Sequence, residues 1–150
     1  MTTLEKVENW LEQNTYQLDQ FKDLANLAKL KTEKGYSVAV VIPTLEEEET
    51  VGNVLECLVT KLMKQYNIID EMIIIDGGSK DGTKDACSLF SDYVTFYEQS
   101  DILRNVCNFN GKGEALWKSL YVTKSDIVIY IDSDIKNFDE RFVTGILGPM

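Results

Sequence analysis

The sequence predicts an α/β fold, in which a mostly parallel sheet with helices on both faces is preceded by a helical N-terminal arm. From residue 36 onward, short apolar runs alternate with apolar positions at helical spacing, and parallel strands buried on both faces have such continuous apolar runs. The first 35 residues show helical spacing alone. A chain of 150 residues has the size of one domain or of half a larger one. We therefore expect an arm over 1–35 and a sheet domain over 36–150.

The arm is expected to be helical with one break. Its first apolar stripe has helical spacing and consists of Leu4, Val7, Trp10 and Leu11. Asn14 and Thr15 interrupt the pattern, and Thr15 is the candidate cap of a second helix that stops at Gly35. An amphipathic arm of this kind is expected to pack on the main domain, and its apolar stripe would also suit a homodimer interface.

The sheet domain follows in strict alternation. Its expected strands are 37–42, 72–75, 93–97 and 127–131, and its expected helices are 51–62, 83–89, 115–122 and about 142–147. Pro43 is expected to end the first strand, because proline cannot donate to a ladder. Asp81 or Thr83 is the candidate cap of the second helix. The apolar side of the third helix is expected to consist of Leu116, Trp117, Leu120 and Tyr121.

Charge and composition exclude several classes of function. With 15 basic and 25 acidic residues, the net charge is −10, which disfavours nucleic-acid binding and attraction to an anionic membrane surface. No apolar run approaches the ~18 residues of a membrane span. The N-terminus does not resemble a secretory signal, and three cysteines without a C-x-x-C motif indicate a reducing, cytoplasmic compartment. The absence of histidine removes histidine bases and most zinc sites.

Three strand ends carry unusual residues, namely Pro43-Thr44-Leu45, Asp76-Gly77-Gly78 and Asp132-Ser133-Asp134. Ligands of open α/β sheets bind beyond the carboxyl ends of the strands. If the strands are parallel, all three segments face one crevice. The alternative is that these are ordinary turn residues.

Two of the motifs suit a metal ion and a phosphate. Asp132 and Asp134, at alternate positions, can hold one hard cation such as Mg²⁺ or Mn²⁺, which shares its shell with ligand phosphates. The Gly111-Lys112-Gly113 turn precedes a helix whose N-terminus favours an anion, and Lys112 would add a positive charge. Gly-rich turns with a solvated lysine are common, so this motif alone decides nothing.

These segments resemble a known family. The string VAVVIPTLEEEETV at 38–51 resembles the opening of a GT-A nucleotide-sugar glycosyltransferase, a Rossmann-like fold, and IIDGGSKDGT at 74–83 resembles its second strand. The string GKGEALWKSL at 111–120, together with the Asp132-Ser133-Asp134 segment, is more narrowly similar to glucosyl-3-phosphoglycerate synthase. The resemblance covers most of the chain and is strongest over 38–52 and 111–149.

The resemblance implies a role for each matching residue. A uridine base and ribose would lie against Pro43, Thr44, Leu45 and Glu47, and the turn lining the base would hold Asp76 and Gly77. Lys112 would lie near the diphosphate. Asp132, Ser133 and Asp134 would form the ribose and metal motif, with Asp134 on the ion and Asp132 acting more through ribose or water. Two residues depart from the family pattern: Glu46 stands where Asn is frequent, and Gly77 where Ser or Asp is usual.

The implied activity is metal-dependent transfer of glucose from a nucleoside diphosphate donor, expected to be UDP-glucose, to 3-phosphoglycerate with retention. Residues 36–150 would be the donor-binding half of the domain, ending before the acceptor-binding part. The alternatives are another GT-A enzyme, acting on a polyprenyl phosphate or a polysaccharide, or a nucleotide-binding module without turnover. A haloacid-dehalogenase-like phosphatase also uses D-x-D, but its motif lies near the N-terminus.

Overall fold

A four-stranded parallel sheet organises the protein in the computed structural model, which describes residues 1–106, 109 and 111–150. The strand order is β3-β2-β1-β4, and the strands are β1 (Val38–Thr44), β2 (Glu71–Asp76), β3 (Thr95–Glu98) and β4 (Ile127–Tyr130). Every pairing is parallel. The predicted α/β fold class is therefore confirmed, and the carboxyl ends of the strands share one edge of the sheet.

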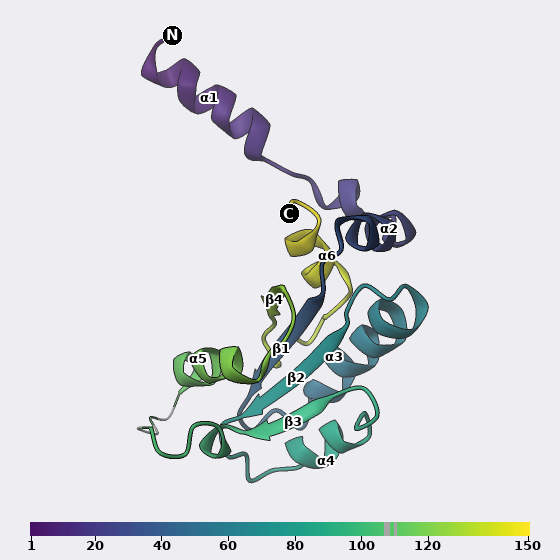
Figure 1. Cartoon of the computed structure of the whole chain (residues 1–150), viewed down its shortest axis with the longest axis vertical. Helices are drawn as coiled ribbons and strands as arrows, with labels where there is room; N and C mark the ends of the chain where they lie inside the picture. Colours follow the sequence, from purple (N-terminus) through teal and green to yellow (C-terminus); the bar gives the residue numbers. More distant parts are fainter. Residues whose placement is uncertain (107–108, 110) are drawn as a thin grey trace.

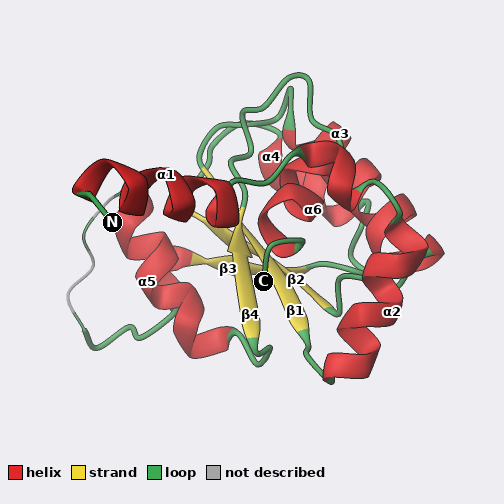
Figure 2. Cartoon of the chain, turned by 90° about the horizontal axis from the view of Figure 1, so that it is seen from above, coloured by secondary structure: helices red, strands yellow, loops and turns green. Residues whose placement is uncertain are grey.

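Helices cover both faces of the sheet (Figure 2). In chain order they are α1 (Thr3–Asn14), η1 (Leu18–Phe21), α2 (Leu24–Lys34), α3 (Val51–Cys57), η2 (Leu58–Gln65), α4 (Thr83–Ser88), η3 (Gln99–Asp101), α5 (Lys112–Val122) and α6 (Arg141–Leu147). The helix α5 lies on one face, while α2, α3, α4 and α6 lie on the other. The turns of η2 are of the π type and continue α3 without a break.

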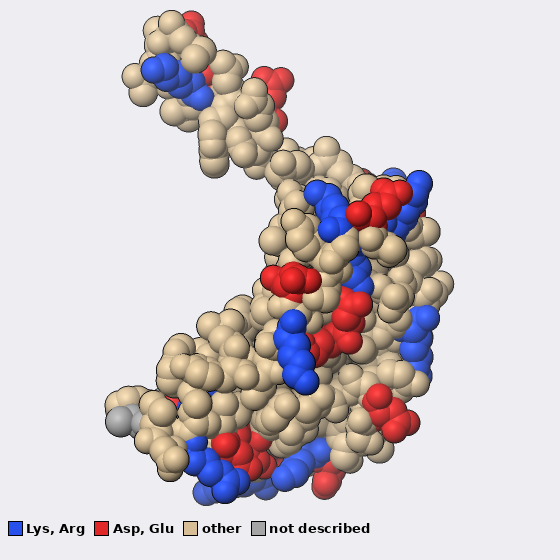
Figure 3. All heavy atoms as spheres, viewed as in Figure 1, with Lys and Arg blue, Asp and Glu red and all other residues tan. Residues whose placement is uncertain are grey.

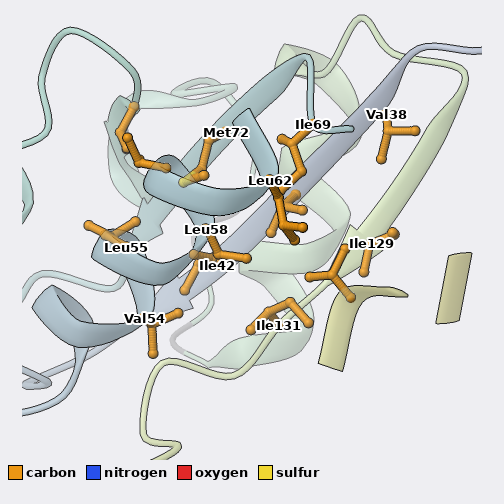
Figure 4. Packing of buried hydrophobic residues seen from close by; sticks show 14 of the residues in the cluster. Val38, Ile42, Val54, Leu55, Leu58, Leu62, Ile69, Met72, Ile129 and Ile131 are labelled. Atoms are coloured by element: carbon orange, nitrogen blue, oxygen red, sulfur yellow. The ribbon is translucent and has the colours of Figure 1, made fainter. Parts of the chain in front are cut away.

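Alternate residues of β1 serve two separate cores. Val38, Val40 and Ile42 point into the larger core, which α3 and η2 close with residues such as Leu55 and Leu58 (Figure 4). Val41 points into the smaller core under α5. Because both faces of the strand are buried, its sequence is continuously apolar, as the prediction assumed.

Pro43 lies inside β1, so the prediction that it ends the strand is wrong. On the β4 side, the ladder reaches Val41, whose carbonyl accepts the Ile131 N–H at 3.0 Å. Pro43 lies two residues further along, and the backbone groups of residues two apart on a strand point toward the same neighbouring strand, here β4. Regular pairing with β4 ends at Tyr130, so a missing N–H at Pro43 costs no ladder bond, while Pro43 stays in register with Ile75 of β2.

The N-terminal arm packs on the domain only in part. No residue of α1, all of which the structure describes, is buried, and the helix projects away from the body (Figure 1). The expectation that its apolar stripe packs on the domain is therefore wrong for α1. It is correct for α2, whose Leu27 joins the larger core. The prediction that Thr15 caps the second helix is wrong. Asp23 caps α2, and its side chain accepts the N–H of Asn26.

The helix α5 presents a different face to the sheet than the sequence predicts. Its buried residues are Ala115, Lys118 and Ser119. The predicted apolar side is largely exposed, with Trp117 42%, Leu120 58% and Tyr121 59% accessible. A charged residue occupies a core position here because Glu114, on the same helix, lies 2.8 Å from Lys118 Nζ. Apolar spacing cannot reveal such a position.

The surface and the thiols bear on the expected setting of the protein. On the face shown in Figure 3, acidic and basic side chains are interspersed. Among the described residues, no helix has the length and apolar character that crossing a membrane requires. Cys57 and Cys87 are free thiols, and Cys107 lies outside the described residues.

Candidate functional site

A cavity of about 380 Å³ opens at the carboxyl edge of the sheet. It is lined by Pro43, Thr44, Leu45, Glu47, Gly77, Gln99, Gly111, Lys112, Ala115, Asp132, Ser133 and Asp134. The structure thus brings together the three strand ends and the Gly-rich turn that the sequence singles out. Of the predicted site residues, only Asp76 is not part of the lining.

The loop after β1 is held by bonds to the loop after β2. The Glu46 N–H donates to Ser79 Oγ at 2.8 Å, and the Glu47 N–H donates to Thr83 Oγ1 at 2.7 Å. Glu46 takes a left-handed conformation with φ of 59°. These bonds fix Leu45 and Glu47 at the mouth of the cavity, where Leu45 is 57% exposed.

Asp76, the last residue of β2, fixes the turn that follows this strand. The residue is 2% exposed, and its carboxylate accepts hydrogen bonds from the Thr44 hydroxyl at 2.8 Å, the Ser79 hydroxyl at 2.6 Å and the N–H groups of Gly78 and Ser79. A buried carboxylate needs such partners. Asp76 therefore supports the residues that line the cavity, and direct contact with a base stays a prediction.

The segment after β4 places its two carboxylates as the alternation of a strand predicts. Ser133 is buried and donates to the Pro43 carbonyl at 2.9 Å, while Asp132 and Asp134 are exposed and line the cavity. This hydrogen bond ties the end of β4 to the end of β1. The two acids are therefore held on one side of a fixed backbone.

The donor set on this segment fits a hard cation. Two carboxylates supply oxygen ligands only, which suits Mg²⁺ or Mn²⁺. Within the described part of the chain, no group of three or more His, Cys, Asp or Glu residues is placed to hold a metal. Asp132 and Asp134 would supply two of the oxygen ligands of such an ion, whose shell the oxygen atoms of a ligand diphosphate can share.

The N-terminus of α5 supplies positive charge to the same cavity. Gly111 has φ of 137°, a conformation that side chains rarely adopt, and it precedes the first residue of the helix, Lys112. Lys112 Nζ contacts the carboxylate of Asp132. The helix dipole and the ammonium group together favour an anion beside the two carboxylates.

Three lining residues were not among the predicted site residues: Gln99, Gly111 and Ala115. The sequence points to Gly111 only as part of the Gly-rich turn before α5, and Ala115 carries no chemical signal. Gln99 directly follows β3, so the rule that ligands meet strand ends points to it. It is 7% exposed, and its side-chain amide donates to the Phe109 carbonyl at 2.8 Å.

Cys87, which is buried behind this region, does not supply a nucleophile. Burial raises the pKa of the Cys87 thiol to about 12, and the nearby Asp76 carboxylate adds to the rise. A thiol with this pKa stays protonated near neutral pH.

Comparison with known proteins identifies relatives of the chain. The model of the family described as Glycosyl transferase family 2 matches residues 39–149. Glucosyl-3-phosphoglycerate synthase of Petrotoga mobilis is 38% identical over 131 residues, which cover 87% of this chain and 40% of that protein. The chain thus spans about two fifths of the length of this curated relative.

The fold also occurs in solved structures, including the following two. The crystal structure of mannosyl-3-phosphoglycerate synthase from Rubrobacter xylanophilus has a TM-score of 0.86 and 32% identity over 95% of this chain and 44% of that one. Glucosyl-3-phosphoglycerate synthase from Mycobacterium tuberculosis, in complex with Mn²⁺, UDP and phosphoglyceric acid, has a TM-score of 0.72 and 36% identity over 84% of this chain and 42% of that one.

Proposed function

The chain belongs to glycosyl transferase family 2, and from this we propose that residues 36–150 form the donor-binding half of a glucosyl-3-phosphoglycerate synthase. The proposed reaction transfers glucose from UDP-glucose to 3-phosphoglycerate, retains the anomeric configuration and requires Mg²⁺ or Mn²⁺. Support comes from the relatives named above, one of which is solved with Mn²⁺, UDP and phosphoglyceric acid. A reducing, cytoplasmic setting and a homodimer stay predictions of the same proposal.

One observation carries the proposal: a single cavity joins an apolar wall, two carboxylates and an ammonium group. The wall of Pro43, Leu45 and Gly77 suits the flat face of a nucleoside base. The exposed pair of Asp132 and Asp134 lies on another wall of the same cavity. A nucleoside diphosphate with a divalent ion has a matching set of parts, namely a flat base, a metal ion and an anionic diphosphate.

The residues of the chain have distinct parts in the proposed transfer. A metal ion, when bound, would stabilise the charge that develops on the departing diphosphate. Asp134 would hold the ion, and Asp132 would lie toward the ribose. Lys112 would exchange its contact with Asp132 for one with the diphosphate, and it would thereby add a charge-assisted hydrogen bond.

Lys112→Ala tests this assignment. We expect the variant to bind UDP about tenfold or more weakly in the presence of Mn²⁺ and to bind uridine with nearly unchanged affinity, because a hydrogen bond to a charged group is worth roughly 1.5–3 kcal/mol. Calorimetric titration with both ligands measures the two effects. Lys124→Ala, an exposed lysine that follows α5, is the matched control. An equal loss of affinity for UDP and for uridine would show that Lys112 has a structural role instead.

A further inference from the structure

Helix α5 carries a buried ion pair that the proposed function does not use. The Lys118 side chain is 0% exposed and its Nζ lies 2.8 Å from Glu114 Oε1, while the Glu114 side chain is 7% exposed. Replacing a buried ion pair with apolar residues of similar volume is often neutral or stabilising. Stability alone therefore does not explain why these two positions carry charges.

The pair reaches beyond its own helix. Lys118 Nζ donates to the backbone carbonyl of Gln99 at 2.9 Å, and the second carboxylate oxygen of Glu114 accepts the N–H of Phe109. The side-chain amide of Gln99 donates to the Phe109 carbonyl at 2.8 Å. Gln99 and Phe109 are thus bonded to each other and to one helix.

These bonds join two walls of the cavity. Gln99 forms the wall that follows β3, while Gly111, Lys112 and Ala115 form the wall at the start of α5. The hydrogen bond from Lys118 to the Gln99 carbonyl fixes the position of Gln99 relative to α5, the helix whose first residue is Lys112. The spacing of the two walls is consequently set by a buried pair within the first two turns of α5.

We propose that Glu114 and Lys118 are positioning residues of the donor cavity. They fix Gln99 against the N-terminus of α5, so that the cavity has the width of a nucleoside diphosphate before the ligand arrives. This inference rests on the proposed function, because it takes UDP as the ligand. Preorganised walls increase affinity by removing the cost of ordering them on binding. The pair therefore contributes to binding without contacting the ligand.

The double variant Glu114→Gln/Lys118→Met removes both charges and roughly keeps the volume of the side chains. It leaves no unpaired buried charge, so the domain is expected to stay folded. We expect its affinity for UDP with Mn²⁺ to fall about tenfold or more, because Gln99 is no longer held by α5. Calorimetric titration measures the affinity, and a urea unfolding curve measures the stability of the same sample.

Lys31 offers a control of the same chemistry at the other end of the sheet. Its Nζ lies 2.6 Å from Asp70 Oδ1 and donates to the Asn67 carbonyl at 3.0 Å, and its side chain is 8% exposed. Lys31→Met/Asp70→Asn therefore also removes a lysine that bonds a carboxylate and a backbone carbonyl. We expect this control variant to lower the stability of the protein without weakening its binding of UDP. A merely structural role of Glu114 and Lys118 would make the two double variants behave alike.

The outcomes separate this inference from the proposed function. If the intact chain binds no UDP, the proposed function is contradicted, and with it the ligand named here. If the intact chain binds UDP and the folded Glu114→Gln/Lys118→Met variant binds it equally well, only the positioning role is overturned. Should that variant not fold, Glu114→Asp keeps the charges and shortens the reach to Phe109, and the same loss of affinity is expected from it.

Discussion

Glu46 shows how a single backbone angle sets residue preferences at the mouth of the cavity. Its φ of 59° is a conformation that costs most side chains about 1–2 kcal/mol, whereas Asn adopts it more readily. Asn, which the resemblance implies for this position in many family members, suits this backbone angle. The conformation is retained here because the Glu46 N–H bonds Ser79 Oγ.

Glu46→Asn is therefore expected to stabilise the protein by about 0.5–1 kcal/mol, since it relieves part of this strain and leaves the backbone N–H in place. A rise in the urea midpoint measures the effect. Glu49→Asn makes the same change of charge three residues away, at a position without positive φ, and is expected to have little effect. Equal shifts in both variants would assign the gain to charge instead.

At the scale of single residues, the sequence predicts the site where the backbone alternates regularly. Asp132 and Asp134 share one side because they follow a strand, and Ser133 turns inward as that alternation requires. The burial of Lys118 cannot be predicted from such alternation. Its burial depends on a carbonyl 19 residues away in the chain, which only the folded structure brings into reach.

Among the elements, η1 and α6 meet more closely than their sequences suggest. A Cβ atom added at Gly148 would lie well inside van der Waals contact of the ring of Phe21. The φ of Gly148 is −58°, so the backbone itself would accept any residue. Glycine is needed here for space, and η1 is anchored by that contact.

Gly148→Ala is expected to destabilise the protein by about 1–3 kcal/mol, because the Phe21 ring or the end of α6 must move. Gly52→Ala is the matched control: it lies in α3, nothing lies within 4 Å of an added Cβ, and we expect a gain of about 0.5–1 kcal/mol. Urea unfolding of both variants provides the measurement. A neutral Gly148→Ala would show that the contact between η1 and α6 is loose.

Element types were predictable, whereas several boundaries and partners were not. Apolar runs locate β1, β2 and β4, and the more polar segment 93–97 overlaps β3. Pro43 stays inside β1 because of where its neighbour β4 ends, which is a property of the sheet. The spacing in α1 predicts its helix correctly. The same spacing cannot say what the stripe packs on, and in this structure the stripe is exposed.

The two edges of the sheet differ across the whole molecule. At the amino edge, carboxylates accept hydrogen bonds from residues at the start of β1. Asp70 accepts the Val38 N–H at 2.7 Å, and Asp126 accepts both the N–H and the hydroxyl of Ser37. At the carboxyl edge, Asp132 and Asp134 stay exposed in a cavity. Acidic residues therefore stabilise one edge and are available for binding at the other.

The amino edge gives a prediction about pH. The Ser37 hydroxyl, followed by its N–H, holds the pKa of Asp126 below its ordinary value of 3.8. The folded state thus binds fewer protons than the unfolded chain, so the stabilisation is present above pH 3.8 and is lost as the pH falls through the lower folded value. We expect Asp126→Asn to be less stable than the parent near neutral pH, with the gap closing in acid.

Urea unfolding of the parent and of Asp126→Asn, measured from pH 7 down to about pH 2.5, tests this expectation. Comparing two proteins that share the remaining charges cancels most of the effect of the net charge of −10. A gap that stays constant or widens in acid would contradict the assigned role of the Ser37 hydrogen bonds.

The central claim, that the carboxyl edge binds a nucleoside diphosphate together with a metal ion, is tested most directly at Asp134. We expect the parent to bind UDP much more tightly with Mn²⁺ than with EDTA, and Asp134→Asn to lose this dependence while the thermal stability without ligand stays unchanged or rises slightly. Relief of repulsion between Asp132 and Asp134 is the reason for the rise. Asp92→Asn, an exposed acid outside the cavity, should behave like the parent. UDP binding that never depends on Mn²⁺, or unfolding caused by Asp134→Asn, would contradict the claim.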